Sequence, residues 1–397
     1  PYKMINPLHE QKIIGLDTVA SDYFGYSVSL SGDYAIVGAR NEDSYRGAAY
    51  IYKRNESGVW GDEQKITASD KQTQDNFGVS VSISGDYAVV GAQGKDSYTG
   101  AAYIYKRNGT TWGDEQKIVA SDRQGGDQFG WSVSLSGDYA IVGAHVEDPG
   151  GTSNAGSAYI FKRNASTGVW GDEQKITASD RQGDDQFGTS VSISGEYTIV
   201  GALGKDTGTG AAYIYTRNGT TWGDEQKITA GDRQAYDNFG ESVSISGDYA
   251  IVGVPTEDPG GTGEAGAAYI YKRNASGVWG DEQKITASDK QQGDRFGWSV
   301  SLSGDYAIVG AYQEDPGGTD AAGSAYVFKR DGTTWSQITK IFASDKASST
   351  SAQFGHSVSI SGDYVIVGAN YEDTRGADAG AAYIYPFEPL LDFDNFN

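Results

Sequence analysis

Apolar and polar residues alternate along short segments of the chain. From Phe77 to Ile83 the sequence reads FGVSVSI, so bulky side chains point to one side and glycine or serine to the other. A period of two residues is typical of a β-strand. Apolar segments at 87–92 and 101–106 and a more polar one at 112–118 follow. We therefore predict four short strands in succession and essentially no α-helix, because no segment shows apolar residues at the helical spacing.

This group of four segments occurs seven times. The dipeptide Phe-Gly opens each copy and recurs at intervals of 52 to 58 residues. A Ser-Gly-Asp turn or a close variant joins the first two strands, and its glycine supplies the positive φ that a tight hairpin turn requires. Self-similarity at a nearly fixed spacing predicts a repeat architecture. The copies begin at Phe24, Phe77, Phe129, Phe187, Phe239, Phe296 and Phe354.

The apolar content falls from the first segment of each copy to the fourth. Both faces of the first two strands lack charge, whereas the fourth carries the polar run DEQK at 114–117. A β-propeller has this gradient, because the first strand of each blade lies near the axis and the fourth at the rim. The bulky face of one blade would pack on the small face of the next, which explains why glycine accounts for 56 of 397 residues. We predict an all-β, seven-bladed β-propeller of four-stranded antiparallel blades.

The two ends of the sequence fit together as one blade. Residues 10–13 (EQKI) match the fourth-strand segment at 63–66, whereas the last copy stops near Tyr385 without a fourth strand. We expect the N-terminal strand to complete the last blade and close the ring, which removes exposed sheet edges. An open β-solenoid, the alternative, does not explain why the missing strand occurs at the start. The predicted propeller spans residues 1–385, and residues 386–397 form a C-terminal extended tail.

Three features that recur among the copies together resemble the FG-GAP repeat of seven-bladed propellers: Phe-Gly, a second strand ending in Val-Gly-Ala, and Gly-Ala-Ala-Tyr. That family includes the heads of integrin α subunits and bacterial surface proteins. The resemblance covers residues 10–385 and implies the propeller fold. Two features differ from the family: the proline of Gly-Ala-Pro is almost absent, and the short Ser-Gly-Asp turn replaces the family's calcium loop. The resemblance therefore does not carry the family's calcium sites over to the turn between the first and second strands.

Composition narrows the choice of partners and location. The chain has 31 Lys and Arg against 53 Asp and Glu, a net charge of −22, so nucleic acids and anionic membrane surfaces would be repelled. No apolar run approaches the roughly 20 residues of a membrane helix, and cysteine is absent. We expect a secreted or cell-surface protein that neither binds nucleic acid nor inserts into a membrane.

The sequence contains no familiar catalytic motif. Gly-x-Ser-x-Gly, His-Glu-x-x-His and phosphate-binding loops are all missing, and the three histidines lie in different copies. The many carboxylates recur at equivalent positions, which favours a structural role, because an active site is needed only once. We predict that the protein is not an enzyme.

Two aspartates five residues apart recur in the loop that precedes each Phe-Gly. The simpler interpretation is that they accept hydrogen bonds from loop N–H groups. Alternatively, they could bind calcium, a hard cation that takes roughly six to eight oxygen ligands. The candidate calcium ligands are Asp70, Asp75, Asp122, Asp127, Asp180 and Asp185.

The copies differ most at the residue that follows Phe-Gly and at the residue that follows Val-Gly-Ala. We expect the first set to surround the mouth of the central channel and the second to lie just outside it, on exposed loops. Drift at tolerant positions would also create variety, but large aromatic residues and arginine suit a binding surface, and Trp and Tyr rings also stack on sugars. The candidate ligand-binding residues are Tyr26, Arg40, Trp131, His145, Trp298, Tyr312 and His356.

These observations predict a non-enzymatic extracellular recognition or adhesion module. It would bind a glycan or a protein ligand on the loop face around the central channel. The alternative is a structural subunit of a surface layer, sheath or filament, with self-association through the C-terminal tail. Recognition requires the channel-mouth residues, whereas assembly requires the tail, so variants in the two regions distinguish the hypotheses.

Overall fold

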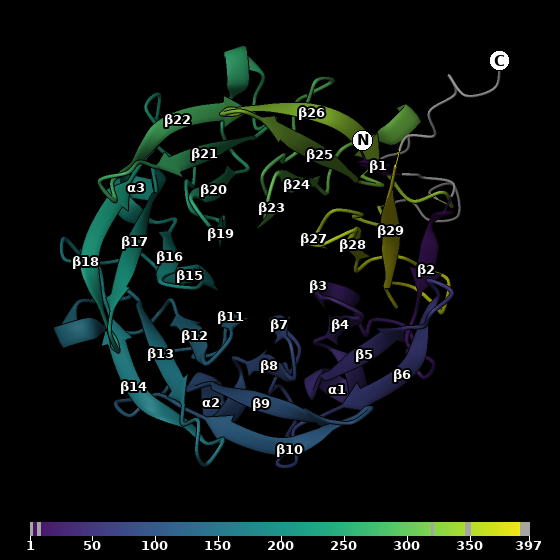
Figure 1. Cartoon of the computed structure of the whole chain (residues 1–397), viewed down its shortest axis with the longest axis vertical. Coiled ribbons are helices and arrows are strands. Elements are labelled where there is room, and N and C mark those ends of the chain that lie inside the picture. The colour runs from purple at the N-terminus through teal and green to yellow at the C-terminus, as the bar shows by residue number, and fades with distance from the viewer. Residues whose placement is uncertain (1–2, 6–8, 319–320, 346–350, 390–397) are drawn as a thin grey trace.

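Seven antiparallel β-sheets surround a common axis in the computed structural model, which describes residues 3–5, 9–318, 321–345 and 351–389 (Figure 1). Blade 1 contains β3 (Phe24–Ser31), β4 (Tyr34–Ala39), β5 (Ala48–Arg54) and β6 (Trp60–Ile66). Blade 2 contains β7 (Val81–Ser84), β8 (Tyr87–Ala92), β9 (Ala101–Asn108) and β10 (Thr111–Ile118). Blade 3 contains β11 (Ser132–Ser136), β12 (Tyr139–Ala144), β13 (Ser157–Arg163) and β14 (Trp170–Ile176). Blade 4 contains β15 (Phe187–Ser194), β16 (Tyr197–Ala202), β17 (Ala211–Asn218) and β18 (Thr221–Ile228).

The second half of the ring repeats this order. Blade 5 contains β19 (Ser242–Ser246), β20 (Tyr249–Val254), β21 (Ala267–Arg273) and β22 (Trp279–Ile285). Blade 6 contains β23 (Ser299–Ser303), β24 (Tyr306–Ala311), β25 (Ser324–Asp331) and β26 (Thr334–Ile341). Blade 7 contains β27 (Ser357–Ser361), β28 (Tyr364–Ala369), β29 (Ala381–Pro389), β2 (Gln11–Ile13) and β1 (Lys3–Ile5). The predicted all-β, seven-bladed fold is confirmed.

The N-terminal strands close the ring, as the sequence predicts. β2 pairs antiparallel with β29, with Lys12 opposite Tyr383, and β1 pairs with the far end of the same strand. β29 also continues to Pro389, so residues 386–389 belong to the sheet rather than to an extended tail. Phe387 is buried there, with its ring centroid 4.8 Å from that of Tyr306 in blade 6. Residues 390–397, the rest of the predicted tail, lie outside the described residues.

The Phe-Gly dipeptide joins each blade to the preceding one. In blade 2, β7 begins only at Val81, four residues later than predicted, whereas the equivalent strands of blades 1 and 4 begin at the phenylalanine. Phe77 instead forms an isolated parallel bridge with Gly47 of blade 1. The same bridge connects Phe24 with Gly380 across the closure of the ring.

The hydrophobic core lies between blades rather than within them. Phe77 and Val81 of blade 2 pack in one cluster with Ile36 and Ile51 of blade 1. Glycine permits this close approach: a Cβ on Gly38 would lie 2.1 Å from the main-chain oxygen of Gly78. The predicted contact between a bulky face and a small face is therefore present, although isoleucines also contribute to the smaller face.

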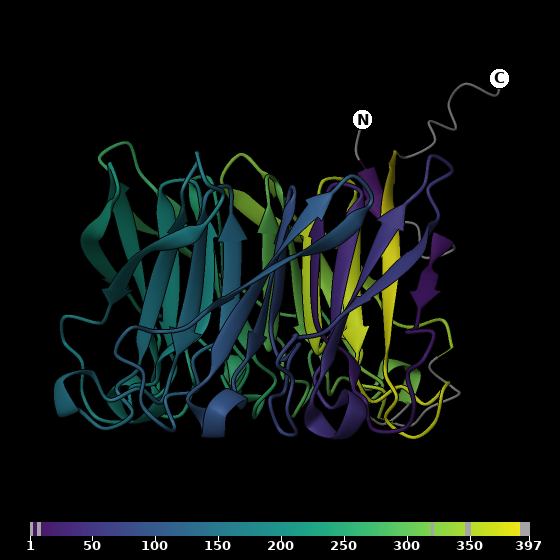
Figure 2. The ribbon, with the colours of Figure 1, turned by 90° about the horizontal axis from the view of Figure 1, so that it is seen from below.

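The loops that contain the candidate site residues all emerge on one side of the ring, which we call the Phe-Gly face. The loop after the second strand forms a four-residue turn in three blades, at α1 (Glu42–Tyr45), α2 (Lys95–Tyr98) and α3 (Lys205–Gly208). Three other blades have a 3₁₀ turn there, at η2 (Pro149–Gly151), η3 (Pro259–Gly261) and η4 (Pro316–Gly318). The short helices lie along the lower edge in Figure 2, and the Ser-Gly-Asp turns lie on the opposite face.

Candidate functional site

The residue after each Phe-Gly points into the centre of the ring. All seven of these residues line one cavity of about 220 Å³ together with serine and valine side chains of the innermost strands. We call this set the channel ring, and its position matches the prediction. Its members are Tyr26, Val79, Trp131, Thr189, Glu241, Trp298 and His356.

Aromatic side chains of blades 6, 7 and 1 form a continuous cluster at the channel ring. The ring centroid of His356 lies 4.8 Å from that of Tyr26 and 5.9 Å from that of Trp298. Trp298 also packs against Tyr312, with centroids 4.7 Å apart. The guanidinium of Arg40 lies over the Tyr26 ring at 3.9 Å, a cation–π contact. Five of the seven candidate ligand-binding residues therefore gather on one side of the channel.

The other two candidates form a separate pair in blade 3. The rings of Trp131 and His145 have centroids 4.5 Å apart. All seven candidates are half-buried, which corrects the prediction that they stand on exposed loops. Contacts within and between blades cover these side chains: Trp131 packs on His145 of its own blade, whereas Tyr26 packs on His356 of the neighbouring blade.

Burial sets the charge of the titratable groups in this region. It lowers the pKa of His145 and of His356 to about 4, so both imidazoles are neutral at physiological pH. Burial raises the pKa of Glu241 to about 7, against the opposing effect of the Arg295 guanidinium. The channel ring therefore contains one carboxyl group that titrates near neutrality.

The sequence-based choice of ligand-binding residues left out three members of the channel ring, Val79, Thr189 and Glu241, and Glu241 is the ionisable one. It follows the Phe-Gly of blade 5, so its position was a sufficient signal. Two more residues, Gln93 and Asn370, follow the second strands of blades 2 and 7 and are 7% and 1% exposed. Within the described part of the chain, Gln93 Oε1 and Asn370 Oδ1 have no hydrogen-bond partner.

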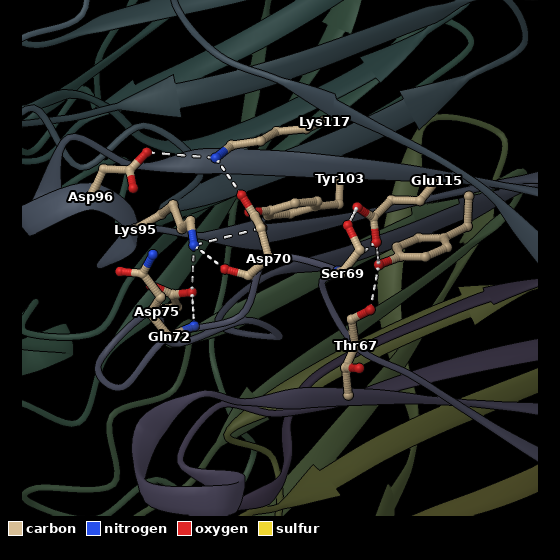
Figure 3. A network of polar contacts seen from close by, with 11 residues as sticks. Thr67, Ser69, Asp70, Gln72, Asp75, Lys95, Asp96, Tyr103, Glu115 and Lys117 are labelled. Atoms are coloured by element: carbon tan, nitrogen blue, oxygen red, sulfur yellow. Dashed lines mark hydrogen bonds and ion pairs between the residues drawn. The ribbon is translucent and has the colours of Figure 1, made fainter.

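The aspartate pairs form polar networks that connect adjacent loops and strands (Figure 3). Asp70 accepts hydrogen bonds from the Tyr103 hydroxyl at 2.6 Å and from the Lys117 ammonium at 2.8 Å. Asp75 accepts one from the main-chain N–H of Gln72 at 2.6 Å and one from Lys95 Nζ at 3.1 Å. Both carboxylates thus have hydrogen-bonding partners in the protein.

The other two candidate calcium pairs are arranged similarly. Asp180 accepts hydrogen bonds from Tyr213 and Lys227, and Asp185 accepts one from Lys205. In blade 3, Asp122 contacts Tyr159 and Lys175, while Asp127 accepts the main-chain N–H of Gln124. Over the described ranges, no group of three or more His, Cys, Asp and Glu side chains is spaced to hold a metal ion. Calcium at these six residues stays a prediction, and the geometry favours the structural interpretation.

The family model of the FG-GAP repeat matches the chain seven times, at residues 8–52, 60–105, 112–161, 170–215, 222–271, 279–328 and 335–385. The chain belongs to the FG-GAP repeat family. Each matched segment begins at the outer strand of one blade and ends in the third strand of the next. No curated protein matches the chain.

Among solved structures, the FG-GAP propeller is similar to a chain of hydrazine synthase from Kuenenia stuttgartiensis. The TM-score is 0.56 at 11% sequence identity, and the similarity covers 89% of this chain and 95% of that one. At this identity the likeness concerns the propeller fold alone and carries no activity to this protein. None of the helices in the described residues has the length and apolarity to cross a bilayer.

Proposed function

We propose that this FG-GAP propeller is a non-enzymatic extracellular recognition module that binds a glycan or protein ligand at the channel ring. One observation carries the proposal: the seven copies share nearly the same strands and turns, whereas the channel ring has six residue types at seven equivalent positions. Packing does not require the tryptophans there, because Val79 and Thr189 fill the same place in blades 2 and 4.

The chemistry of the channel ring suits recognition. Trp131, Trp298 and Tyr26 are half-buried, so each offers part of its ring to a ligand without a loss of order in the side chain. Such anchored aromatic residues contribute strongly to protein interfaces, and their faces also stack on sugars. Glu241 adds a carboxyl group to a cavity that serine side chains of the innermost strands also line.

The family supports a location outside the cell. The FG-GAP repeats that this chain resembles occur in integrin heads and bacterial surface proteins. A secreted or surface-attached propeller would present the Phe-Gly face to its ligand. Secretion can be tested directly by fractionation of the producing cells and by detection of the chain in the medium or on the cell surface.

The test replaces both tryptophans by the residue that blade 2 already uses. We expect the Trp131→Val and Trp298→Val double variant to lose binding on a glycan array and on a panel of purified extracellular proteins. Its melting temperature should stay close to that of the original chain. A matched control changes Val59 and Val169 to Ala, because these residues are exposed on the opposite face. Equal binding by the tryptophan variant and the original chain would contradict the proposal.

A further inference from the structure

One position in the loop after the second strand carries lysine in two blades and glutamate in the other five. Lys95 is 1% exposed, and its ammonium lies 2.5 Å from the main-chain oxygen of Asp70 and 3.1 Å from Asp75 Oδ2 (Figure 3). Lys205 has the same environment in blade 4, at 2.5 Å from the Asp180 oxygen and 3.0 Å from Asp185 Oδ2. In both blades a cation therefore lies among loop oxygens. The glutamates are Glu42, Glu147, Glu257, Glu314 and Glu372.

The first carboxylate oxygen of each glutamate pairs with a lysine of the neighbouring outer strand. The Oε1–Nζ distances lie between 2.6 and 2.9 Å in all five blades. The lysine ammonium is therefore already engaged and leaves the second oxygen, Oε2, to find another partner. The lysines are Lys12, Lys65, Lys175, Lys284 and Lys340.

The second oxygen has a donor in three of these blades. Ser157 and Ser324 donate hydroxyl hydrogen bonds to Glu147 and Glu314, at 2.5 and 2.6 Å. In blade 7, the main-chain N–H of Thr374 donates to Glu372 at 3.0 Å. Each of these carboxylates is thus satisfied on both oxygens.

Blades 1 and 5 have alanine where blades 3 and 6 have the serine. In consequence Glu42 Oε2 and Glu257 Oε2 are buried without a hydrogen-bond partner in the described part of the protein. Glu257 is only 3% exposed. A buried carboxylate oxygen without a partner is costly, so a missing partner is implied. The alanines are Ala48 and Ala267.

Few positively charged groups surround Glu257. Asp237 is 6% exposed, so this carboxylate is buried beside that of Glu257. Asp232, Asp237 and Glu257 face a single ammonium, that of Lys284. In blade 2, by contrast, Asp70 and Asp75 face two ammonium groups. Blades 3 and 6 also have one such lysine, but there a serine hydroxyl satisfies the glutamate, so the missing donor is what sets blade 5 apart.

We propose that blades 1 and 5 each bind a Ca²⁺ ion at the place that a lysine ammonium occupies in blades 2 and 4. In blade 5 the ligands are Glu257 Oε2, the Asp237 carboxylate and the main-chain oxygen of Asp232, and water completes the shell. In blade 1 the equivalent groups come from Glu42, Asp22 and Asp17. A hard divalent cation suits an all-oxygen ligand set.

These proposed sites use other residues than the sequence-based calcium candidates, and they rest on a glutamate oxygen without a donor among the described residues rather than on paired aspartates. The pairs Asp70–Asp75 and Asp180–Asp185 already hold lysine, so they have no need of a metal. Both new sites lie on the Phe-Gly face, opposite the Ser-Gly-Asp turns that replace the family's calcium loops. They are also independent of the channel ring, so their failure would leave the proposed recognition function intact.

The test measures calcium binding to the full chain by calorimetry, together with the melting temperature in CaCl₂ and in EDTA. We expect two ions per chain, and a higher melting temperature with calcium, because a ligand that binds only the folded state stabilises it. Terbium should give luminescence on excitation of tyrosine, since Tyr50 and Tyr269 donate hydrogen bonds to Asp17 and Asp232.

Two variants introduce, in blades 1 and 5, residues that occupy the equivalent positions in other blades. Asn41→Gly with Glu42→Lys reproduces the Gly94–Lys95 pair of blade 2 in an equivalent turn. Ala267→Ser supplies the hydroxyl that blades 3 and 6 use. Each should remove one bound ion without lowering the melting temperature in EDTA, and Glu257→Gln should remove the same ion as Ala267→Ser. An original chain that binds no calcium, or a combined variant that still binds two ions, would overturn the proposal.

Discussion

At the residue scale, the turns α1, α2 and α3 contain non-glycine residues with positive φ, which their sequences do not predict. Asp43, Ser44 and Tyr45 have consecutive φ values of 49°, 64° and 65°, in the left-handed region. The same turn in blade 4 ends in Gly208, with a φ of 74°. Glycine adopts this conformation freely, whereas a bulky residue does so at a cost. Tyr45 is nevertheless 52% exposed, so burial does not explain its presence.

Replacement of this tyrosine should therefore stabilise the fold. We expect Tyr45→Gly to raise the free energy of unfolding by about 0.5–1 kcal/mol, because glycine removes the steric cost of positive φ. Tyr98→Gly should act in the same direction, since Tyr98 has a φ of 62°. Denaturant unfolding measures the change. A loss of stability in both variants would show that the tyrosine rings contribute more packing than the strain costs.

The carboxyl group of Glu241 predicts a pH dependence of stability. Its pKa is raised from 4.5 to about 7 by burial, so the folded state holds a proton that the unfolded state releases. Stability should therefore fall as pH rises through this interval, and Glu241→Gln should remove that part of the fall. Melting temperatures of both proteins between pH 5 and about pH 8 provide the comparison. Parallel profiles would contradict the assignment.

At the element scale, the apolar segments and the polar segment that follows them predict the second, third and fourth strands to within two residues. β8 (Tyr87–Ala92) coincides with the predicted segment. β7 starts four residues late, although β3 and β15 begin at the phenylalanine of the same pattern, so the sequence pattern does not distinguish these starts. Which side chains occupy the channel ring follows from their position after Phe-Gly. Their half-burial does not follow from the sequence, because it depends on contacts between blades such as that of Tyr26 with His356.

The roles of Lys95 and Glu257 were also beyond sequence analysis. Each lies in a loop whose partners come from a segment about 20 residues away along the chain. The sequence shows Ser157 in blade 3 and Ala267 in blade 5, but not what this difference does. The structure shows that Ser157 donates a hydrogen bond to Glu147, whereas Glu257 Oε2 has no donor among the described residues. The aspartates alone suggested a cation, and the structure shows that lysine supplies it in two blades.

The glycines of the second strands determine how closely neighbouring blades pack. We expect Gly38→Ala to lower the free energy of unfolding by about 1–3 kcal/mol, because its Cβ would lie 2.1 Å from the Gly78 oxygen and the blades would have to separate. Gly61→Ala is the matched control, since no heavy atom lies within 4 Å of a Cβ there. Chemical denaturation of both variants should separate them clearly. Similar effects would argue against tight packing at Gly38.

At the scale of the whole molecule, the closure of the ring is the main long-range constraint. Ile13 of β2 is buried, and β2 covers the outer edge of β29. Deletion of residues 1–13 should lower the free energy of unfolding by at least the roughly 1.5–3 kcal/mol that one buried isoleucine contributes. It should also promote association through the exposed edge of β29. An unchanged melting temperature would show that the ring does not depend on this strand.

The repetition of the molecule also explains where its function is expected. Strands, turns and glycine contacts recur in nearly every blade, so they serve the scaffold. The channel ring is the place where large side chains differ from blade to blade and face a common cavity. A binding site that draws one residue from each blade exists only when the ring is closed, which links the proposed function to the fold.

The most direct measurement is a binding screen of a chain whose channel ring is made uniform. Valine, which blade 2 carries at position 79, would replace the five large or charged members of the ring, and binding to glycans and extracellular proteins would be compared with that of the original chain. The account predicts a folded propeller that has lost its ligands, whereas a folded propeller that keeps them would contradict it. The replaced residues are Tyr26, Trp131, Glu241, Trp298 and His356.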